Sequence, residues 1–355
     1  METIALTKEN YRLWDDFCAG SDDAWFWHTT RWLDYCVAYG RENYGTENLS
    51  FIVVDDTGPI AICPLLKEKG AFAAAGGGKY GALPALANSL TESRREKILK
   101  FIFEKIDSLA EMKNVKKALC RASPLARNKL KFNYLVKHGY LDDSLNTELI
   151  DLTRPIEEIW VAVRKGHKYD INRGKKSFKV ELFDRDNADK GIFDQYRLLH
   201  HKAAGRVTRP VETFDMMYQW LMSGDGLLCG LSHEGRFVGF SYVCLYKEAA
   251  YYASASDDPE FVTEAPISHL IQWEITNYLK AKGFKTYEIG VQQFGPQVND
   301  VPNAKDISIS LFKRGFGGET VTFYRGIKYY DKEFMRTELE HKLIELVAGY
   351  QAGEG

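Results

Sequence analysis

A chain of 355 residues is longer than one typical core requires and predicts two domains of ordinary size. Its hydrophobic fraction of 45% and charged fraction of 27% are typical of a soluble globular protein, and its longest apolar runs are too short to cross a membrane. Because 47 Lys and Arg residues face 49 Asp and Glu residues, the net charge of −2 disfavours a protein that coats nucleic acid.

The six cysteines are scattered along the chain, and none forms a CxxC pair or clusters with a histidine. Dispersed cysteines are typical of small buried side chains in a reducing compartment. The first residues contain neither the basic stretch nor the apolar core of a secretion signal. We therefore expect a cytoplasmic protein, and we expect no metal, since no residue set has the spacing of a metal site.

Helical and strand patterns alternate through the first half of the chain. The three-and-four spacing of apolar residues predicts helices over 7–20, 91–111 and 125–138, and another that begins at Thr29 or Thr30. Strands are predicted over 51–54, 60–67, 116–121 and 146–152. His28 and Arg31 lie at the start of the second helix, beside a tryptophan cluster that belongs to the core, and are candidate substrate contacts.

A glycine-rich segment over 71–81 has the composition of a phosphate-binding loop. It lacks the Gly-Lys-Ser/Thr ending at Walker spacing, and it contains no GxGxxG. The segment therefore predicts a flexible wall beside a ligand or a plain bend in the sheet.

The second half repeats this order loosely. Strands are predicted over 178–183, 226–232, 237–246, 249–256, 285–289 and 320–326, with a further element over 311–316. Helices are predicted over 190–203, 211–222, 263–283 and 331–348. The helix that begins at Thr263, Glu264 and Pro266 and ends at Gly283 lies between two strands, and its N-terminus offers free N–H groups to an anion. The two similar halves suggest a duplicated domain.

Three motifs of the second half resemble a known family. They are AGRVTRP at 204–210, ISHLIQWE at 267–274 and LFKRGFGG at 311–318. Together they resemble the double-GNAT, FemAB-like branch of the GNAT N-acyltransferases. That branch includes aminoacyl-tRNA-dependent peptidoglycan bridge transferases and acyltransferases encoded with surface-polysaccharide genes.

The resemblance implies an α/β (α+β) fold with two tandem GNAT-like domains, each a mixed, mainly antiparallel sheet flanked by helices. We expect the first domain over 1–152 and the second over 153–330, with the closing helix 331–355 packed on the first. The resemblance also implies acyl-CoA as a co-substrate. One departure stands out, because the stretch 257–269 has no glycine turn and Pro266 lacks an N–H, so pyrophosphate binding at this helix is expected to be weak.

The densest basic run of the chain is RKGHKY at 164–169. On a helix its guanidinium, ammonium and ring suit a diphosphate and a base, and in the resembling family this junction lies near the nucleotide of the acceptor. A solvated basic helix face explains the run equally well. The candidate contacts are Arg164, Lys165, Lys168, Tyr169 and Arg173.

Further binding candidates lie in the loops and strands of the second half. Arg206 and Arg209 can clamp a phosphate or carboxylate, although Arg206 can also cap the preceding helix. Lys313 precedes a glycine pair and can neutralise a phosphate. Hydroxyl groups on strands can contact substrate or pack within the sheet, and the candidates are Tyr242, Tyr252 and Ser254.

Amide formation from an activated acyl group requires a proton acceptor and oxyanion donors. Asp257 ends a strand, Glu288 lies on the next, and His269 lies near the start of the helix between them, so these three are the catalytic candidates. His269 is equally well explained as a packing histidine. No Ser-His-Asp or Cys-His arrangement is supported by spacing.

These observations favour direct transfer of an acyl group from acyl-CoA to the amino group of a nucleotide-linked amino sugar, in surface-polysaccharide (O-antigen or capsule) synthesis. One alternative is an aminoacyl-tRNA-dependent peptide ligase of the peptidoglycan-bridge type, which the slightly negative net charge disfavours. The other is a non-catalytic double-GNAT binding module, which the missing glycine turn would fit.

Overall fold

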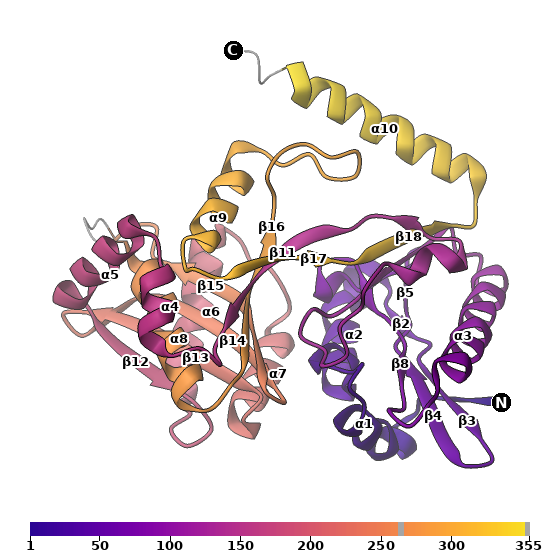
Figure 1. The fold of residues 1–355 in the computed structure, drawn as a ribbon. Coiled ribbons are helices and arrows are strands. Elements are labelled where there is room, and N and C mark those ends of the chain that lie inside the picture. Colours follow the sequence, from indigo (N-terminus) through magenta and orange to yellow (C-terminus); the bar gives the residue numbers. More distant parts are fainter. Residues whose placement is uncertain (262–265, 352–355) are drawn as a thin grey trace. The chain divides into compact units, whose positions relative to one another are not determined.

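The computed structural model describes residues 1–261 and 266–351, and the chain divides into two compact units. Unit 1 contains Met1–Asn146, Gln293–Ser308 and Thr322–Gly355, and unit 2 contains Thr147–Gln292 and Ile309–Val321 (Figure 1). This division differs from a simple split near residue 152, because the chain returns to unit 1 twice after entering unit 2.

Unit 1 contains two sheets. The first has four strands in the order β1 (Glu2–Ala5), β3 (Phe51–Asp55), β4 (Gly58–Cys63) and β8 (Ala85–Leu86). The second has seven strands, in the order β10 (Leu141–Asp142), β18 (Arg325–Tyr329), β9 (Lys117–Arg121), β6 (Ala71–Phe72), β5 (Leu66–Glu68) and β2 (Glu47–Asn48), with β7 (Gly81–Ala82) also paired to β9. The strands predicted over 51–54 and from residue 60 form a hairpin, in which β3 and β4 pair in antiparallel register around residues 55–58.

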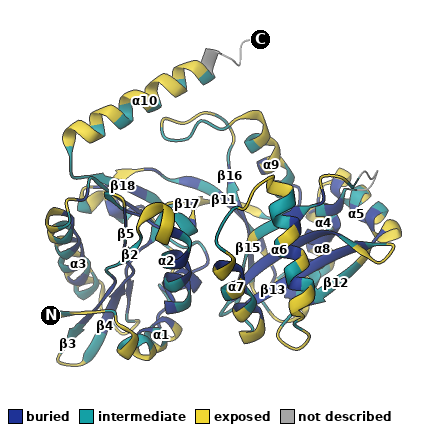
Figure 2. Ribbon diagram, turned by 180° about the vertical axis from the view of Figure 1, so that it is seen from behind, coloured by how far each residue is buried: buried dark blue, intermediate teal, exposed yellow. Residues whose placement is uncertain are grey.

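The helices of unit 1 begin where capping residues predict. Thr29 accepts a hydrogen bond from the N–H of Trp32 at the start of α2 (Thr30–Tyr44), and Thr91 does the same for Arg94 at the start of α3 (Glu92–Met112). The other helices are α1 (Tyr11–Gly20) and α10 (Lys332–Gln351), with short 3-10 turns η1 (Lys8–Asn10), η2 (Phe26–His28), η3 (Ala75–Gly77) and η4 (Tyr134–His138). One face of α3 is buried in the core (Figure 2).

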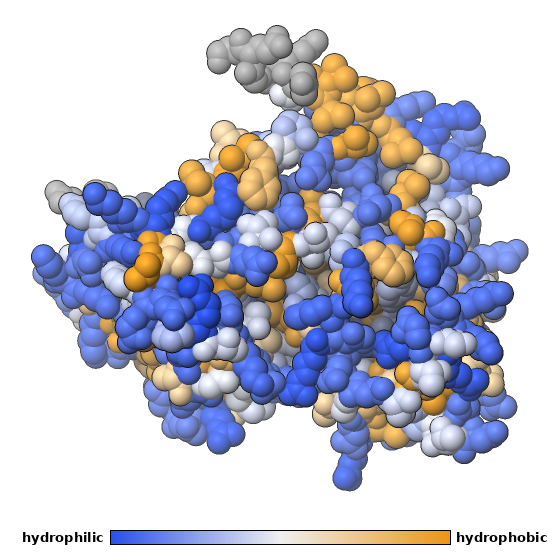
Figure 3. All heavy atoms as spheres, in the orientation of Figure 1, coloured by the Kyte–Doolittle hydropathy of each residue, from blue (hydrophilic) through white to orange (hydrophobic). Residues whose placement is uncertain are grey.

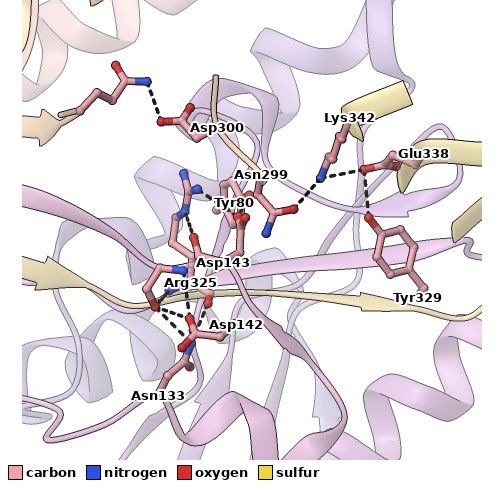
Figure 4. A network of polar contacts seen from close by, with 12 residues as sticks. Tyr80, Asn133, Asp142, Asp143, Asn299, Asp300, Arg325, Tyr329, Glu338 and Lys342 are labelled. Carbon is pink, nitrogen blue, oxygen red and sulfur yellow. Dashed lines mark hydrogen bonds and ion pairs between the residues drawn. The ribbon is translucent and has the colours of Figure 1, made fainter. Parts of the chain in front are cut away.

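Helix α10 differs from the others because its described side chains are exposed or only half-buried (Figure 2). Exposed apolar side chains gather along it, visible as an orange band at the upper right of Figure 3, and include Leu343, Ile344 and Val347. Polar side chains of α10 contact other parts of unit 1. Lys342 contacts Asn299 and also Glu338 of the same helix, and Glu338 accepts a hydrogen bond from Tyr329 (Figure 4). No helix in the described part of the chain is both long enough and apolar enough to span a bilayer.

Unit 2 is built on one seven-stranded sheet. Its order is β12 (Lys179–Phe183), β13 (Gly226–His233), β14 (Arg236–Tyr246), β15 (Ala249–Asp257), β16 (Thr286–Gln292), β11 (Leu145–Asp151) and β17 (Glu319–Phe323). Strands β12 to β15 pair antiparallel, and β15 and β16 pair parallel around the connecting helix α8 (Ile267–Ala281). The remaining helices are α4 (Ile156–Ala162), α5 (Lys165–Ser177), α6 (Lys190–Ala204), α7 (Val211–Ser223) and α9 (Ala304–Arg314). The mixed α/β architecture is confirmed.

Helix α8 packs as its apolar stripe predicts. Ile267, Leu270, Ile271, Ile275 and Leu279 are all buried in the core of unit 2. The helix ends before Gly283, whose φ of +84° requires the left-handed region. Its predicted starting residues Thr263 and Glu264 lie outside the described residues, and Pro266 stands at the N-cap without a side-chain capping bond.

Two predicted elements are wrong, and the element of unspecified type over 311–316 begins as a helix. The helix over 125–138 is a series of turns that ends in η4, because side-chain hydrogen bonds hold its main chain open. The element over 311–316 is the end of helix α9 and the turn after it. The strand over 320–326 is divided into β17 and β18, which belong to different sheets.

Candidate functional site

The parallel ladder between β15 and β16 ends early. Its register pairs are Ala249 with Thr286, Ala250 with Tyr287, and Tyr251 with Glu288. Beyond this point β15 continues along β14 as far as Asp257, while β16 continues to Gln292. In the described part of both strands, the facing edges past Glu288 therefore carry main-chain N–H and C=O groups that this ladder does not use.

A carboxylate and an ammonium group lie where the ladder ends. Glu288 is 3% exposed, and its Oε1 accepts a hydrogen bond of 2.8 Å from Thr147 Oγ1. Lys313 Nζ donates to the carbonyl oxygen of Val291 at 3.3 Å. Burial lowers the pKa of Lys313, and the Glu288 carboxylate opposes this shift by attraction. The Glu288 carboxylate of β16 and the Lys313 ammonium group of α9 therefore lie together at the point where the ladder ends.

The main chain of β16 bends to accommodate this lysine. Gly290 has a φ of +111°, and a Cβ atom at this position would lie 2.9 Å from Lys313 Nζ. Only glycine combines this conformation with such a close approach. The sequence motif around Lys313 identified the lysine, whereas its partner glycine gave no signal of its own.

Asp257 lies at the end of β15, next to the start of α8. Its Oδ2 accepts from Ser268 Oγ at 2.7 Å, while its buried Oδ1 has no hydrogen-bond partner among the described residues. Burial raises the pKa of Asp257, and the Ser268 hydrogen bond opposes the shift. A carboxylate with a raised pKa and an unoccupied oxygen is suited to accept a proton.

His269 lies in a cluster of rings rather than beside these carboxylates. Its ring centroid is 4.3 Å from that of His167 and 4.9 Å from that of Phe312, and its Nε2 is 3.7 Å from Asp170 Oδ2. Burial and the neighbouring His167 lower the pKa of His269 to about 4, so the ring is neutral at pH 7. This packing between α5 and α9 matches the structural alternative for His269.

The predicted basic run forms the N-terminal half of α5. Arg164 is its N-cap residue, and its Nη2 lies 3.1 Å from His167 Nδ1. Lys168 Nζ donates to the Val161 carbonyl at 2.9 Å, whereas Tyr169 is 63% exposed with the Arg173 guanidinium 5.4 Å from its ring centre. Lys165 is exposed. The run is thus a surface feature of unit 2 in which an exposed ring and cations lie together.

Helices α6 and α7 cover the opposite face of the sheet. There Arg209 Nη2 donates to Tyr196 Oη at 3.4 Å, and Ser254 Oγ lies 3.4 Å from His200 Nδ1. Burial, followed by the charge of Arg209, lowers the pKa of His200 to about 4. The sequence did not identify Tyr196 as part of this group, because only tertiary packing joins it to the strands.

Tyr242 and Arg206, which were also predicted to bind substrate, have different surroundings on the side of the sheet that carries α6 and α7. Tyr242 is fully buried and donates its hydroxyl to the Met217 carbonyl at 2.8 Å, as the packing alternative requires. Arg206 is exposed in the turn that follows Gly205, whose φ is +65°, and its N–H donates to His201 at 3.2 Å.

Tyr252 faces α8. Burial raises the pKa of Tyr252, and the neighbouring Ser241 and Gln272 side chains oppose the shift. Tyr287 donates to Gln272 Oε1 at 2.6 Å, while the buried Nε2 of Gln272 has no partner among the described residues. This buried polar chain under α8 was missed by sequence reasoning, because Gln272 falls on the apolar face of the helix.

The two substrate-binding candidates of unit 1 differ in burial. His28 is 2% exposed, and its ring nitrogens lie 2.9 Å from the Leu83 carbonyl and 3.1 Å from the main chain of Trp25, so it serves the core. Arg31 is half-buried in the first turn of α2. The glycine-rich segment is a bend held by Glu68, which accepts from the Ala75 N–H at 2.9 Å.

Comparison with known proteins identifies the domain. Residues 162–296 match the family model described as an acetyltransferase (GNAT) domain. This match lies mostly in unit 2 and agrees with the predicted acyltransferase activity. No curated protein matches the chain in sequence.

Solved structures extend the likeness to the whole chain. A crystal structure of FemX is similar with a TM-score of 0.67 and 13% identity, covering 96% of this chain and 100% of FemX. A tandem GNAT protein from the clavulanic acid biosynthesis pathway has a TM-score of 0.53 and 13% identity, covering 92% and 98%. A C-terminal domain from Agrobacterium fabrum, named for lysylphosphatidylglycerol synthetase, has a TM-score of 0.58 and 12% identity, covering 95% of each chain. The tandem GNAT-like fold is thus confirmed.

Proposed function

We propose that unit 2 transfers an acyl group from acyl-CoA by direct attack onto the amino group of a nucleotide-linked amino sugar used for surface polysaccharide. The observation that carries this proposal is the early end of the β15–β16 ladder, beside Glu288 and Lys313. Main-chain groups that the β15–β16 ladder does not pair suit an extended ligand with amide groups, as in strand addition. The pantetheine arm of acyl-CoA is such a ligand, and the proposal places the protein where acyl-CoA is available, in the cytoplasm.

Direct attack is supported by the state of the cysteines. Cys229 and Cys244, both in unit 2, are fully or almost fully buried, and burial raises the pKa of both thiols. Thiols of this kind are poor nucleophiles, which disfavours a cysteine-bound acyl intermediate.

Side chains near β15 and β16 have roles in each step of the proposed reaction. The amine nitrogen forms a bond to the thioester carbonyl carbon, the carbon–sulfur bond breaks, and CoA leaves as the thiol. Asp257 or Glu288 accepts the proton that the amine loses, and the proton passes to the leaving sulfur. Lys313 stabilises the negative charge that develops on the carbonyl oxygen.

The N-terminal half of α5 supplies the proposed nucleotide contacts. Arg164, Lys165, Lys168 and Arg173 provide positive charge for a diphosphate, and the exposed ring of Tyr169 can stack on a base. Arg206 and Arg209 supply further cations in the same unit.

The test is a thiol-release assay with acetyl-CoA or 3-hydroxyacyl-CoA and a panel of nucleotide-linked amino sugars. We expect release of CoA thiol only with an amino sugar present. Asp257→Asn and Glu288→Gln separate the two proton acceptors, because only the variant of the true acceptor loses the rate increase at higher pH. Absence of thiol release with every amino sugar, together with turnover of aminoacyl-tRNA, would overturn the proposal.

The similarity to FemX over 96% of the chain favours a second candidate. The chain would then transfer an amino acid from aminoacyl-tRNA to a muropeptide, with the same attack of an amine on an activated carbonyl. This candidate predicts ester-bond cleavage in aminoacyl-tRNA and no use of acyl-CoA, so the assay above distinguishes the two.

A further inference from the structure

Two successive residues of α9 hold the bend of β16 at Gly290. Lys313 Nζ donates to the Val291 carbonyl oxygen at 3.3 Å. Arg314 Nη1 donates to Gln292 Oε1 at 3.0 Å, and Gln292 Nε2 donates to the Gly290 carbonyl oxygen at 3.2 Å. The C-terminal end of α9 is therefore joined to three successive residues of the strand.

The Gln292 side chain is 1% exposed and uses both ends of its amide. Its Oε1 accepts from a guanidinium group, which can only donate, and its Nε2 donates to a main-chain carbonyl, which can only accept. Glutamate has a similar shape but offers no amide donor, and methionine offers neither group. Glutamine at this position therefore joins Arg314 to Gly290 in a way that these two residues cannot.

A buried carboxylate of β11 attracts the Arg314 guanidinium. Glu148 is 2% exposed, and its Oε2 accepts from Thr320 Oγ1 at 2.6 Å. Burial raises the pKa of Glu148, and the Thr320 hydrogen bond followed by the Arg314 charge opposes the shift. This attraction favours a guanidinium held against the sheet, where it reaches Gln292.

The same bend determines where the Lys313 ammonium group lies. A Cβ atom at Gly290 would lie 2.9 Å from Lys313 Nζ, so the main chain and the ammonium group are in close contact. Gly290 has a φ of +111°, and glycine has more backbone freedom than any other residue. The contacts from Gln292 and α9 therefore limit the conformations of the bend and, with them, the position of Lys313.

We propose that Gln292 and Arg314 are positioning residues, which hold the bend of β16 and thereby place the Lys313 ammonium group for acyl transfer. The inference rests on the proposed function, in which Lys313 stabilises the developing oxyanion. Such a group is effective only when it is held in place before the reaction, and a displacement of about 1 Å can cost about 10²-fold in rate. Loss of either positioning residue should therefore lower kcat through Lys313.

The test is a double-variant cycle in the thiol-release assay. Gln292→Met and Arg314→Met are each made in the wild-type chain and in Lys313→Met. The controls are Gln195→Met and Lys305→Met, which make matched changes at exposed positions on α6 and in the first turn of α9.

We expect Gln292→Met and Arg314→Met to lower kcat about tenfold in the wild-type chain but less than about twofold in Lys313→Met. Both controls should stay within about twofold. Gln292→Glu should lower kcat as far as Gln292→Met, because glutamate keeps an acceptor for Arg314 but has no donor for the Gly290 carbonyl. Melting temperatures show whether each variant folds.

Hydrogen exchange of the main-chain amides at 290–292 gives a readout that needs no substrate. Exchange should become about fivefold faster in Gln292→Met and Arg314→Met, as expected for the loss of one hydrogen bond, and should not change in the controls. Unchanged exchange, or an equal fall in kcat with and without Lys313, would overturn the inference. Absence of thiol release by wild type would instead overturn the proposed function, and exchange would still decide whether Gln292 and Arg314 hold the bend.

Discussion

Each unit contains a strand that follows a long helix and pairs parallel with an earlier strand. This strand is β16 after α8 in unit 2 and β9 after α3 in unit 1, and the two differ in how far the parallel pairing extends. In unit 2, β16 pairs with β15 only over Thr286 to Glu288. In unit 1, β9 is paired along both of its halves, by β6 at Lys117 and Ala118 and by β7 at Cys120 and Arg121. The part of the strand edge that the β15–β16 ladder leaves unpaired in unit 2 therefore has a counterpart in unit 1 that is paired by β7.

The glycine-rich bend explains this difference. It separates β6 from β7, and Glu68 holds it through the Ala75 N–H, so the chain turns back and pairs a second time with β9. At the end of β9, the Arg121 guanidinium lies 5.2 Å from the Trp27 ring, whereas β16 carries the Glu288 carboxylate and has Lys313 of α9 beside it. Two tandem GNAT-like units can therefore differ at this edge, because a second strand pairs with β9 in unit 1 while the β15–β16 ladder stops at Glu288 in unit 2.

The largest expected effect comes from Lys313→Met. We expect kcat for acyl transfer to fall by about 10²–10³, because the proposed role of this ammonium group is to stabilise the developing oxyanion. The thiol-release assay measures this loss. Arg121→Met at the corresponding end of unit 1 should change kcat by less than about threefold, since that edge is closed.

A double variant separates chemistry from stability. Lys313→Met alone removes the attraction between this ammonium group and the buried Glu288 carboxylate and should lower the melting temperature. Lys313→Met combined with Glu288→Gln should recover most of the melting temperature while the rate stays low. If Lys313→Met alone retains a rate within threefold of wild type, the end of β16 is not the reaction site.

His269→Phe tests whether the start of α8 belongs to the reaction site or to the core. The pKa of His269 falls from 6.5 to about 4 on folding. The unfolded chain therefore binds the proton more readily, so the stabilisation is complete above pH 6.5 and is lost as the pH falls toward 4. Over this window the wild-type chain should lose roughly 2–3 kcal/mol of unfolding free energy, and His269→Phe should not show this loss. Urea unfolding at pH 7.5, 5.5 and 4.5 measures the difference.

Activity gives the second readout for this variant. Phenylalanine can replace the ring in its contacts with His167 and Phe312, so the rate at pH 7.5 should remain within about threefold of wild type. A hundredfold loss of rate with an unchanged melting temperature would instead make His269 the catalytic base.

A pair of glycine substitutions compares the two strand ends directly. Gly290→Ala combines a φ of +111° with a Cβ atom 2.9 Å from Lys313, so we expect a loss of about 2–3 kcal/mol in unfolding free energy. Gly78→Ala in the unit 1 bend has a φ of +73° and open space around its Cβ, so its cost should be about 1 kcal/mol. Denaturant unfolding measures both free-energy losses. Equal losses would show that the Lys313 side chain moves away from a Cβ atom at residue 290 at little cost.

Sequence reasoning predicted the elements whose signals are local. Apolar spacing and capping threonines located α2 and α3, and apolar spacing located α8, because each helix carries its own apolar stripe. The helix over 125–138 failed because Asn128 and Asn133 bond to distant main chain, which no periodicity reports. The site follows the same rule, since Glu288 meets Thr147 across 141 residues and only the fold joins them.

Glu68→Gln has the smallest expected effect and tests how unit 1 closes its edge. Burial raises the pKa of Glu68, and the Ala75 and Thr46 hydrogen bonds oppose the shift. The folded chain then binds the proton more readily, so stability from this group is greatest below pH 4.5 and declines as the pH rises through the folded pKa. Because glutamine keeps an acceptor for the Ala75 N–H, unfolding free energy at pH 7 should change by less than about 1 kcal/mol, while the decline with pH flattens. Urea unfolding between pH 4.5 and 7.5 measures this, with exposed Glu96→Gln as the control; a large loss at pH 7 would mean that the carboxylate charge itself holds the bend.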